Sequence, residues 1–95
     1  MIYVDDLNDY PAGGLRSTRW CHMATDGDLA DLHRMAARLG LKRSWFQNEP
    51  RHPHYDLTPS KRASALRLGA RAVSTDERIR RCFPPASPSE RSERP

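Results

Sequence analysis

Hydrophobic and polar positions alternate along the chain in short runs whose period changes several times. The opening "MIYVDD" is β-branched and aromatic, which predicts a first strand over residues 2–4 that ends in two acids. "RWCHMA" predicts a second strand over 19–24, with Trp20 and His22 on one face and the alternate residues on the other. The turn-rich stretch between these two runs separates the strands.

A helical period follows. Apolar residues between Leu29 and Leu39 fall on a single stripe, which predicts a helix over 28–39, capped by Asp26 and ended by Gly40. "KRSWFQ" (42–47) then has the composition of a third strand, and 48–56 is interpreted as a loop because of its prolines.

The second half of the chain carries clear helix-start signals. Thr58 followed by Pro59 predicts an N-cap and first helical residue, and the helix ends at Gly69. "ARAVS" (70–74) predicts a short fourth strand, and "STDE" (74–77) is a capping box that opens a last helix through Arg81. The prediction is therefore a small α/β fold, a single-domain sheet of about four short strands with two to three helices.

Composition sets the limits of this domain. With 95 residues, of which 37% are hydrophobic and 29% charged, the chain can form one small domain, assigned here to residues 1–82. Residues 83–95 are rich in proline, serine, arginine and glutamate and offer little to bury, which predicts a disordered tail. The net charge of +4 favours anionic partners, although the same charge also serves solubility alone.

Location can also be predicted. No apolar run approaches the roughly 20 residues that a membrane-spanning helix needs, and acids interrupt the N-terminus where a signal peptide would be apolar. The two cysteines, Cys21 and Cys82, do not form a CxxC pair. A cytoplasmic protein with reduced thiols and no membrane partner is therefore expected.

Four stretches are similar to a known family. "MIYVDD", "WCHMATD", "WFQ" and "HYDLTPSKRASALRLGA", in this order and spacing, resemble the bacterial and phage family catalogued as domain of unknown function 4031. The resemblance covers roughly residues 1–82, and several uncommon residues are in register: Trp20, His22, Trp45, Gln47, His54 and Tyr55. It implies a short, usually free-standing soluble protein and implies no particular reaction.

A first candidate site lies at the start of the helix that Thr58 opens. Helix N-termini attract anions, and here the first turn also carries Ser60, Lys61 and Arg62. A phosphate or carboxylate would be stabilised by this arrangement. The alternative is that both cations are solvated helix residues and that Thr58 is only a cap.

A second candidate site involves histidines and acids. His54 and Asp56 alternate with His52, so an extended backbone would place them on one side, where they could ligate a divalent metal. Asp5 and Asp6 end the first strand, where paired carboxylates can hold Mg²⁺ or Mn²⁺ or act in acid–base chemistry. The alternatives are a capping role for Asp56 and a simple turn at the two N-terminal acids.

These residues define two classes of function. In the first, the protein binds, and as an enzyme would hydrolyse, a phosphorylated ligand such as a nucleotide or nucleic acid. The second is a non-enzymatic basic interaction module that binds nucleic acid or an acidic protein. Trp45 and Phe46 are interpreted as core rather than as a stacking platform. In the first class, the catalytic candidates are Asp5, Asp6, His22 and His54, the ligand-binding candidates are Ser60, Lys61, Arg62, Gln47 and Tyr55, and the metal candidates are Asp5, Asp6, His54 and Asp56.

Overall fold

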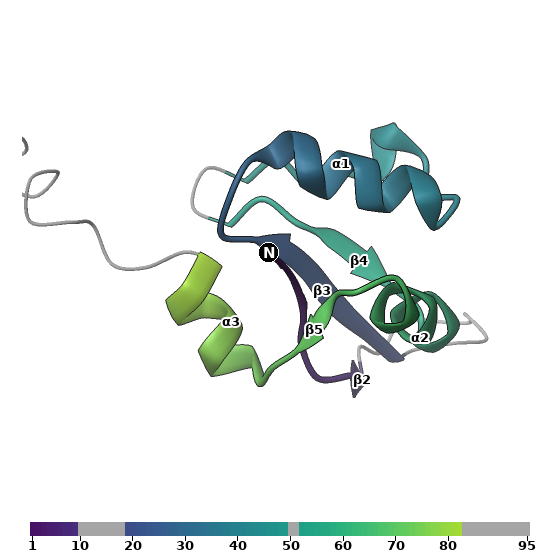
Figure 1. Ribbon diagram of the computed structural model, residues 1–95. Coiled ribbons are helices and arrows are strands. Elements are labelled where there is room, and N and C mark those ends of the chain that lie inside the picture. Colours follow the sequence, from purple (N-terminus) through teal and green to yellow (C-terminus); the bar gives the residue numbers. More distant parts are fainter. Residues whose placement is uncertain (10–18, 50–51, 83–95) are drawn as a thin grey trace, which may run out of the picture.

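The structure, a computed structural model, describes residues 1–9, 19–49 and 52–82 (Figure 1). It has a mixed sheet of five strands and three α-helices, which confirms the predicted α/β class. The predicted tail and most of the predicted first turn lie outside the described residues. The elements are β1 (Ile2–Val4), β2 (Asn8–Asp9), β3 (Arg19–Thr25), α1 (Leu29–Arg38), the 3₁₀ turn η1 (Arg43–Trp45), β4 (Tyr55–Leu57), α2 (Pro59–Arg67), β5 (Arg71–Ala72) and α3 (Thr75–Cys82).

Strand β3 is the centre of the sheet. β1 and β2 both pair with it antiparallel along one edge, and β4 pairs antiparallel along the other. β5 adds to the far side of β1 in parallel, so α2 leads from β4 to a strand beside the first one. The carboxyl ends of β1 and β5 therefore lie together, with Asp5 directly after β1.

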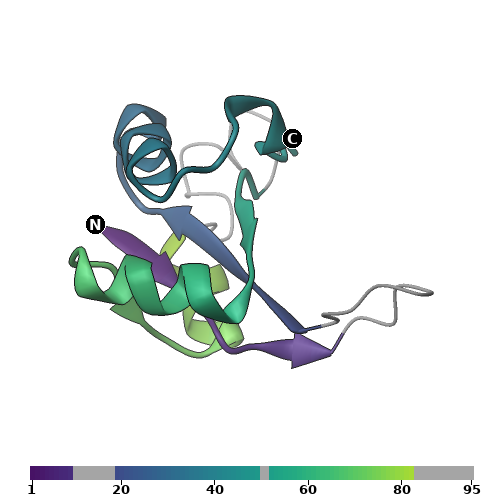
Figure 2. The same cartoon turned by 90° about the vertical axis from the view of Figure 1, so that its right-hand side faces the viewer.

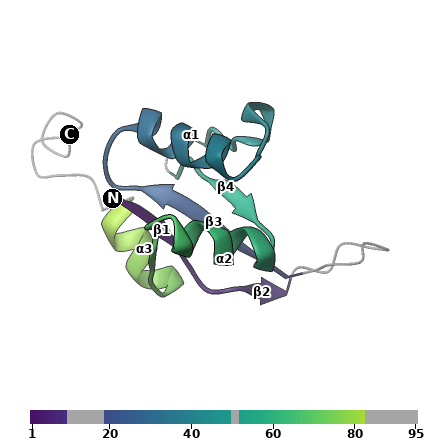
Figure 3. The same cartoon turned by 45° about the vertical axis from the view of Figure 1, so that its right-hand side comes forward.

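The two faces of the sheet are covered differently. Alternate strand residues, including Val4, Met23 and Tyr55, pack with α1 and α2 into one hydrophobic core. On the opposite face, α3 covers the β1 end, where Arg81 lies over the ring of Tyr3 at 5.6 Å from its centroid. Figure 1 shows α3 on one side of the strands and α1 and α2 on the other, and Figures 2 and 3 show the same arrangement turned by 90° and 45°. The remainder of this second face, along β3 and β4, carries the candidates His22, His54 and Asp56.

The helix signals were largely correct. Thr58 Oγ1 accepts a hydrogen bond from the Lys61 N–H at 3.3 Å and Ser74 Oγ accepts one from the Glu77 N–H at 3.0 Å, as capping predicts. Gly40 and Gly69 follow α1 and α2 with positive φ angles of 80° and 108°, which only glycine adopts without strain.

The predicted cap of α1 was wrong. Asp28 occupies the N-cap position, whereas Asp26 accepts hydrogen bonds from the amino terminus and from the Tyr3 hydroxyl. This aspartate therefore ties the start of β1 to the end of β3.

The segment before α2 also departs from the prediction. Residues 42–47, predicted as a strand, contain the single 3₁₀ turn η1, and the predicted loop 48–56 contains part of β4. The aromatic pair Trp45-Phe46 has strand-like composition, but its backbone turns so that Phe46 reaches the core. β4 has only three residues, and its pairing with β3 outweighs the neighbouring prolines.

Within the described residues, none of the helices has the length and apolar character needed to cross a membrane.

Candidate functional site

Asp5 is a fully buried carboxylate with 0% exposure. Its Oδ1 accepts the backbone N–H of His22 at 2.6 Å, which takes the place of a ladder bond and ends the regular pairing of β1 with β3. Its Oδ2 accepts from His22 Nδ1 at 3.0 Å, from Arg78 Nε at 2.8 Å and from the Thr75 hydroxyl at 3.2 Å. We call Asp5, His22, Thr75 and Arg78 the Asp5 network.

This network keeps Asp5 ionised. Burial alone would raise the pKa of the Asp5 carboxyl, but hydrogen bonds from the side chain and backbone of His22, the charge of His22 and the bond from Arg78 together lower it. Asp6, the next residue, is exposed. The predicted pair of acids is therefore split by the strand alternation, because one enters the protein and the other faces away from it.

His22, His54 and Asp56 form a second group on the same face of the sheet. Each offers one ligand atom, and these atoms lie within 4.8 Å of one another. The imidazole rings of His22 and His54 meet edge to face with centroids 4.9 Å apart, and His54 Nε2 lies 3.4 Å from Asp56 Oδ1. We call these three residues the histidine–aspartate cluster. His22 joins it to the Asp5 network.

His54 is held from both sides of its ring. Nδ1 donates to the carbonyl oxygen of His52 at 2.7 Å, and Nε2 faces Asp56. Burial alone would lower the pKa of His54, but the hydrogen bonds to Asp56 and to the His52 carbonyl, with the charges of Asp56 and Glu49, raise it above its ordinary value. The ring is therefore fixed in orientation by partners at both nitrogens.

The cations at the start of α2 have partners within the fold. Lys61 Nζ donates to the carbonyl oxygen of Leu39 at 2.6 Å, at the C-terminus of α1, and Arg62 Nε donates to the backbone carbonyl of Asp5 at 2.8 Å. Ser60 is exposed. Both cations therefore fasten α2 to its neighbours.

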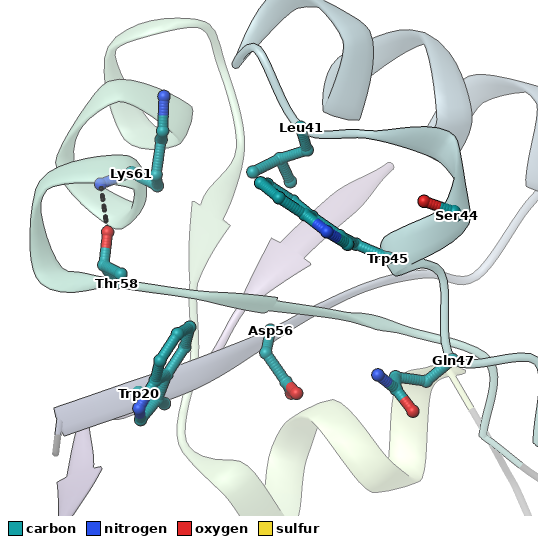
Figure 4. Close-up of a pocket in the computed structure, with 8 residues that line it drawn as sticks. All are labelled: Trp20, Leu41, Ser44, Trp45, Gln47, Asp56, Thr58 and Lys61. Atoms are coloured by element: carbon teal, nitrogen blue, oxygen red, sulfur yellow. Dashed lines mark hydrogen bonds between the residues drawn. The ribbon is translucent and has the colours of Figure 1, made fainter. Parts of the chain in front are cut away.

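A pocket of about 480 Å³ opens along the outer edge of β4 (Figure 4). In this view Trp20, Gln47 and Asp56 lie on one side of the β4 ribbon, and Leu41, Trp45 and Lys61 lie on the other. We call it the tryptophan pocket. It is lined by Trp20, Leu41, Ser44, Trp45, Gln47, Asp56, Thr58 and Lys61.

Asp56 belongs to both the tryptophan pocket and the histidine–aspartate cluster. It lies opposite His22 in the register of β3 and β4, and its side chain is 43% exposed. A ligand in the pocket therefore has access to a carboxylate that also contacts His54.

Two buried side chains, Tyr55 and Cys21, lie away from this region. Tyr55 is buried on the core face of β4, where its hydroxyl is hydrogen-bonded to His33 Nδ1 at 2.9 Å. Cys21 also points to the core, where burial first and the charge of Asp5 second raise its pKa to about 12. Neither side chain lines the tryptophan pocket, whereas Gln47 does.

Several contributors, among them Trp45 and Arg78, were missed by sequence reasoning. Trp45 was interpreted as core but is 50% exposed and lines the pocket. Arg78 is buried against Asp5, although nothing in the pattern of α3 distinguishes it from the neighbouring arginines. The adjacency of Trp45 and Phe46 was the available signal, since the predicted strand would point adjacent side chains to opposite faces.

A small mixed α/β domain with an aromatic-lined pocket beside a histidine–aspartate cluster is thus the class of protein that the fold and site define. The family model described as "Protein of unknown function (DUF4031)" matches residues 2–83, and the chain belongs to this family. The resemblance seen in the sequence is confirmed. Neither a curated protein nor a solved structure matches the chain.

Proposed function

We propose that the protein binds a nucleotide, free or within a nucleic acid strand, with its base in the tryptophan pocket. The observation that carries this proposal is the pairing of two indole side chains with polar groups around one opening. Indole rings stack on any base, and the Gln47 amide and Asp56 carboxylate offer donors and acceptors for a base edge. The half-exposed ring of Trp45 would be covered by such a ligand.

Charge around the pocket supports a phosphorylated ligand. The amine of Lys42 lies 5.7 Å from the centroid of the Trp45 ring, and Lys61 lines the pocket itself. An ammonium group has three N–H donors, so Lys61 can bond to the Leu39 carbonyl and still face an anion. The cations thus lie on the side of the pocket that η1 and α2 line.

Hydrolysis of the bound ligand is a second candidate function, favoured by the position of Asp56. This residue lines the pocket and contacts His54, and its carboxylate can act as a general base toward a water molecule beside the bound ligand. A phosphate held at the pocket mouth would then lie beside a group able to transfer a proton. Release of inorganic phosphate or mononucleotides, lost in Asp56→Asn, is the readout for this activity.

Binding is tested by fluorescence anisotropy with labelled mononucleotides and short single-stranded oligonucleotides. Trp45→Ala should weaken binding by about 1–3 kcal/mol, the usual contribution of one stacked base. Ile79→Ala removes another exposed apolar side chain, on α3, and serves as the matched control. Equal affinity of Trp45→Ala and wild type would contradict the proposal. Affinity that falls with rising salt concentration but is unchanged in Trp45→Ala would favour the basic interaction module.

A further inference from the structure

We infer that His22, His54 and Asp56 form a binding site for a first-row transition-metal ion of the Zn²⁺ type. The sheet register brings the ligands together, because His22 and Asp56 lie directly opposite each other on β3 and β4. The backbone N–H and carbonyl of His22 both bond to Asp5, on the β1 side of β3. His22 and Asp56 are therefore a non-hydrogen-bonded pair, in which cross-strand side chains approach most closely.

The outer partners of both histidines match those of metal ligands. His22 Nδ1 donates to Asp5, and His54 Nδ1 donates to the carbonyl oxygen of His52. Ligating histidines commonly donate one ring N–H to a carboxylate or backbone carbonyl, which fixes the tautomer and directs the other nitrogen to the metal. Here that nitrogen is Nε2, and in His54 it already points at Asp56.

Asp5 would serve as a positioning residue for this site. It does not belong to the group of candidate ligands, but its carboxylate is held by Thr75 and Arg78 and so fixes the ring of His22. The role differs from that of the predicted direct ligand. It explains why a fully buried carboxylate is placed behind a histidine that is itself 20% exposed.

The donor set selects the class of metal. Two imidazole nitrogens with one carboxylate oxygen suit Zn²⁺ and its neighbours, whereas Mg²⁺ and Ca²⁺ prefer oxygen ligands only. Three protein ligands leave a coordination position for water or a substrate oxygen. Because Asp56 also lines the tryptophan pocket, that position would be reached from the pocket side.

A second group of candidate ligands shares His54 and needs to be distinguished. Glu49, His52 and His54 also bring ligand atoms within 4.8 Å of one another. Glu49 and His52 are more than 40% exposed, and their ion pair is formed within one turn of the chain. The cluster with His22 is held by two neighbouring strands and by the groups that accept hydrogen bonds from its two histidines. We therefore assign the metal to this cluster.

The experiment is a titration of the full, chelator-treated chain with Zn²⁺ by calorimetry and with Co²⁺ by visible absorption. We expect one ion per chain and a Co²⁺ spectrum of nitrogen and oxygen ligands. Asp56→Asn and His22→Asn should each weaken binding at least about tenfold, and His52→Ala should leave it unchanged. Asp56 is exposed enough for its variant to fold, so that variant decides the test if His22→Asn does not.

Three results would overturn the inference. One is the lack of Zn²⁺ binding by the wild-type chain, and another is undiminished binding by Asp56→Asn. The third is loss of binding in His52→Ala alone, which would assign the ion to Glu49, His52 and His54. None of these readouts requires a nucleotide, so failure of the proposed function leaves the metal site standing, and the reverse also holds.

Discussion

Asp5 and Asp56 are two carboxylates on the same face of the sheet that differ in burial. The buried carboxylate of Asp5 stabilises the fold, whereas the exposed carboxylate of Asp56 is accessible to a ligand. Asp5 is covered by α3, and its two oxygens accept four hydrogen bonds. Asp56 lies beyond the cover of α3, at the edge strand β4, and is 43% exposed beside a pocket. His22 lies between them and contacts the first directly. A closed network of this kind maintains the fold, whereas an open carboxylate can respond to a ligand.

Asp5→Asn should have the largest effect on stability. The variant removes the carboxylate charge beside the buried Arg78, and breaking a buried ion pair typically costs about 3–5 kcal/mol. Asp6→Asn, one residue away and exposed, is the matched control and should change the free energy of unfolding by less than about 0.5 kcal/mol. Urea unfolding of both variants measures the difference, and similar values for the two would contradict the contrast.

Acid should remove part of the same stabilisation. Because the folded-state pKa of Asp5 lies below its ordinary value of 3.8, its contribution is fully present above that value and is lost as the pH falls through the lowered pKa. The stability difference between wild type and Asp5→Asn should thus be constant near neutral pH and shrink in acid. Urea unfolding at a series of pH values tests this, and a difference that grows on acidification would have the wrong sign.

Thr58→Ala should have an intermediate effect. Thr58 caps α2 and also lines the tryptophan pocket, so it touches both the fold and the site. Loss of the cap should cost about 1 kcal/mol. Ser74→Ala, which removes the equivalent bond from α3, provides the comparison in a thermal melt. A similar loss in both would assign the Thr58 effect to capping, whereas no loss in Thr58→Ala would show that its hydroxyl does not stabilise α2.

Asp56→Asn should have the smallest effect on stability and a clear effect on binding. Its contact with His54 is partly exposed, so its loss should change unfolding by less than about 1 kcal/mol. Nucleotide affinity, measured by anisotropy, should nevertheless fall, because the carboxylate faces the pocket. A variant that loses stability but binds normally would reverse the assignment of the two carboxylates.

The sequence predicted the elements that depend on local chemistry. Helix boundaries were predictable because capping bonds and positive φ angles involve neighbouring residues. They were marked by Thr58-Pro59, Ser74, Gly40 and Gly69. β4 was missed because a three-residue strand next to prolines forms through its pairing with β3, which a local pattern does not contain.

The site was predicted only in part, again because it depends on contacts between residues that are far apart in the sequence. His22, His54 and Asp56 were all singled out, but their meeting follows from the β3–β4 register, which the sequence did not supply. Asp5 was selected as a metal or catalytic group because it ends a strand. Arg78, one of its partners in the structure, is 73 residues away, and an ion pair over such a distance leaves no periodic pattern in the sequence.

An NMR titration of the ¹⁵N-labelled chain with a mononucleotide tests the proposed nucleotide site most directly. The two tryptophans give two indole N–H signals, and both report on the tryptophan pocket. We expect saturable shifts of both signals and of the Gln47 side-chain amide, while the backbone signals of Thr75–Cys82 stay in place. Shifts confined to α3, or none at millimolar nucleotide, would contradict the claim that the open side of the sheet is the binding site.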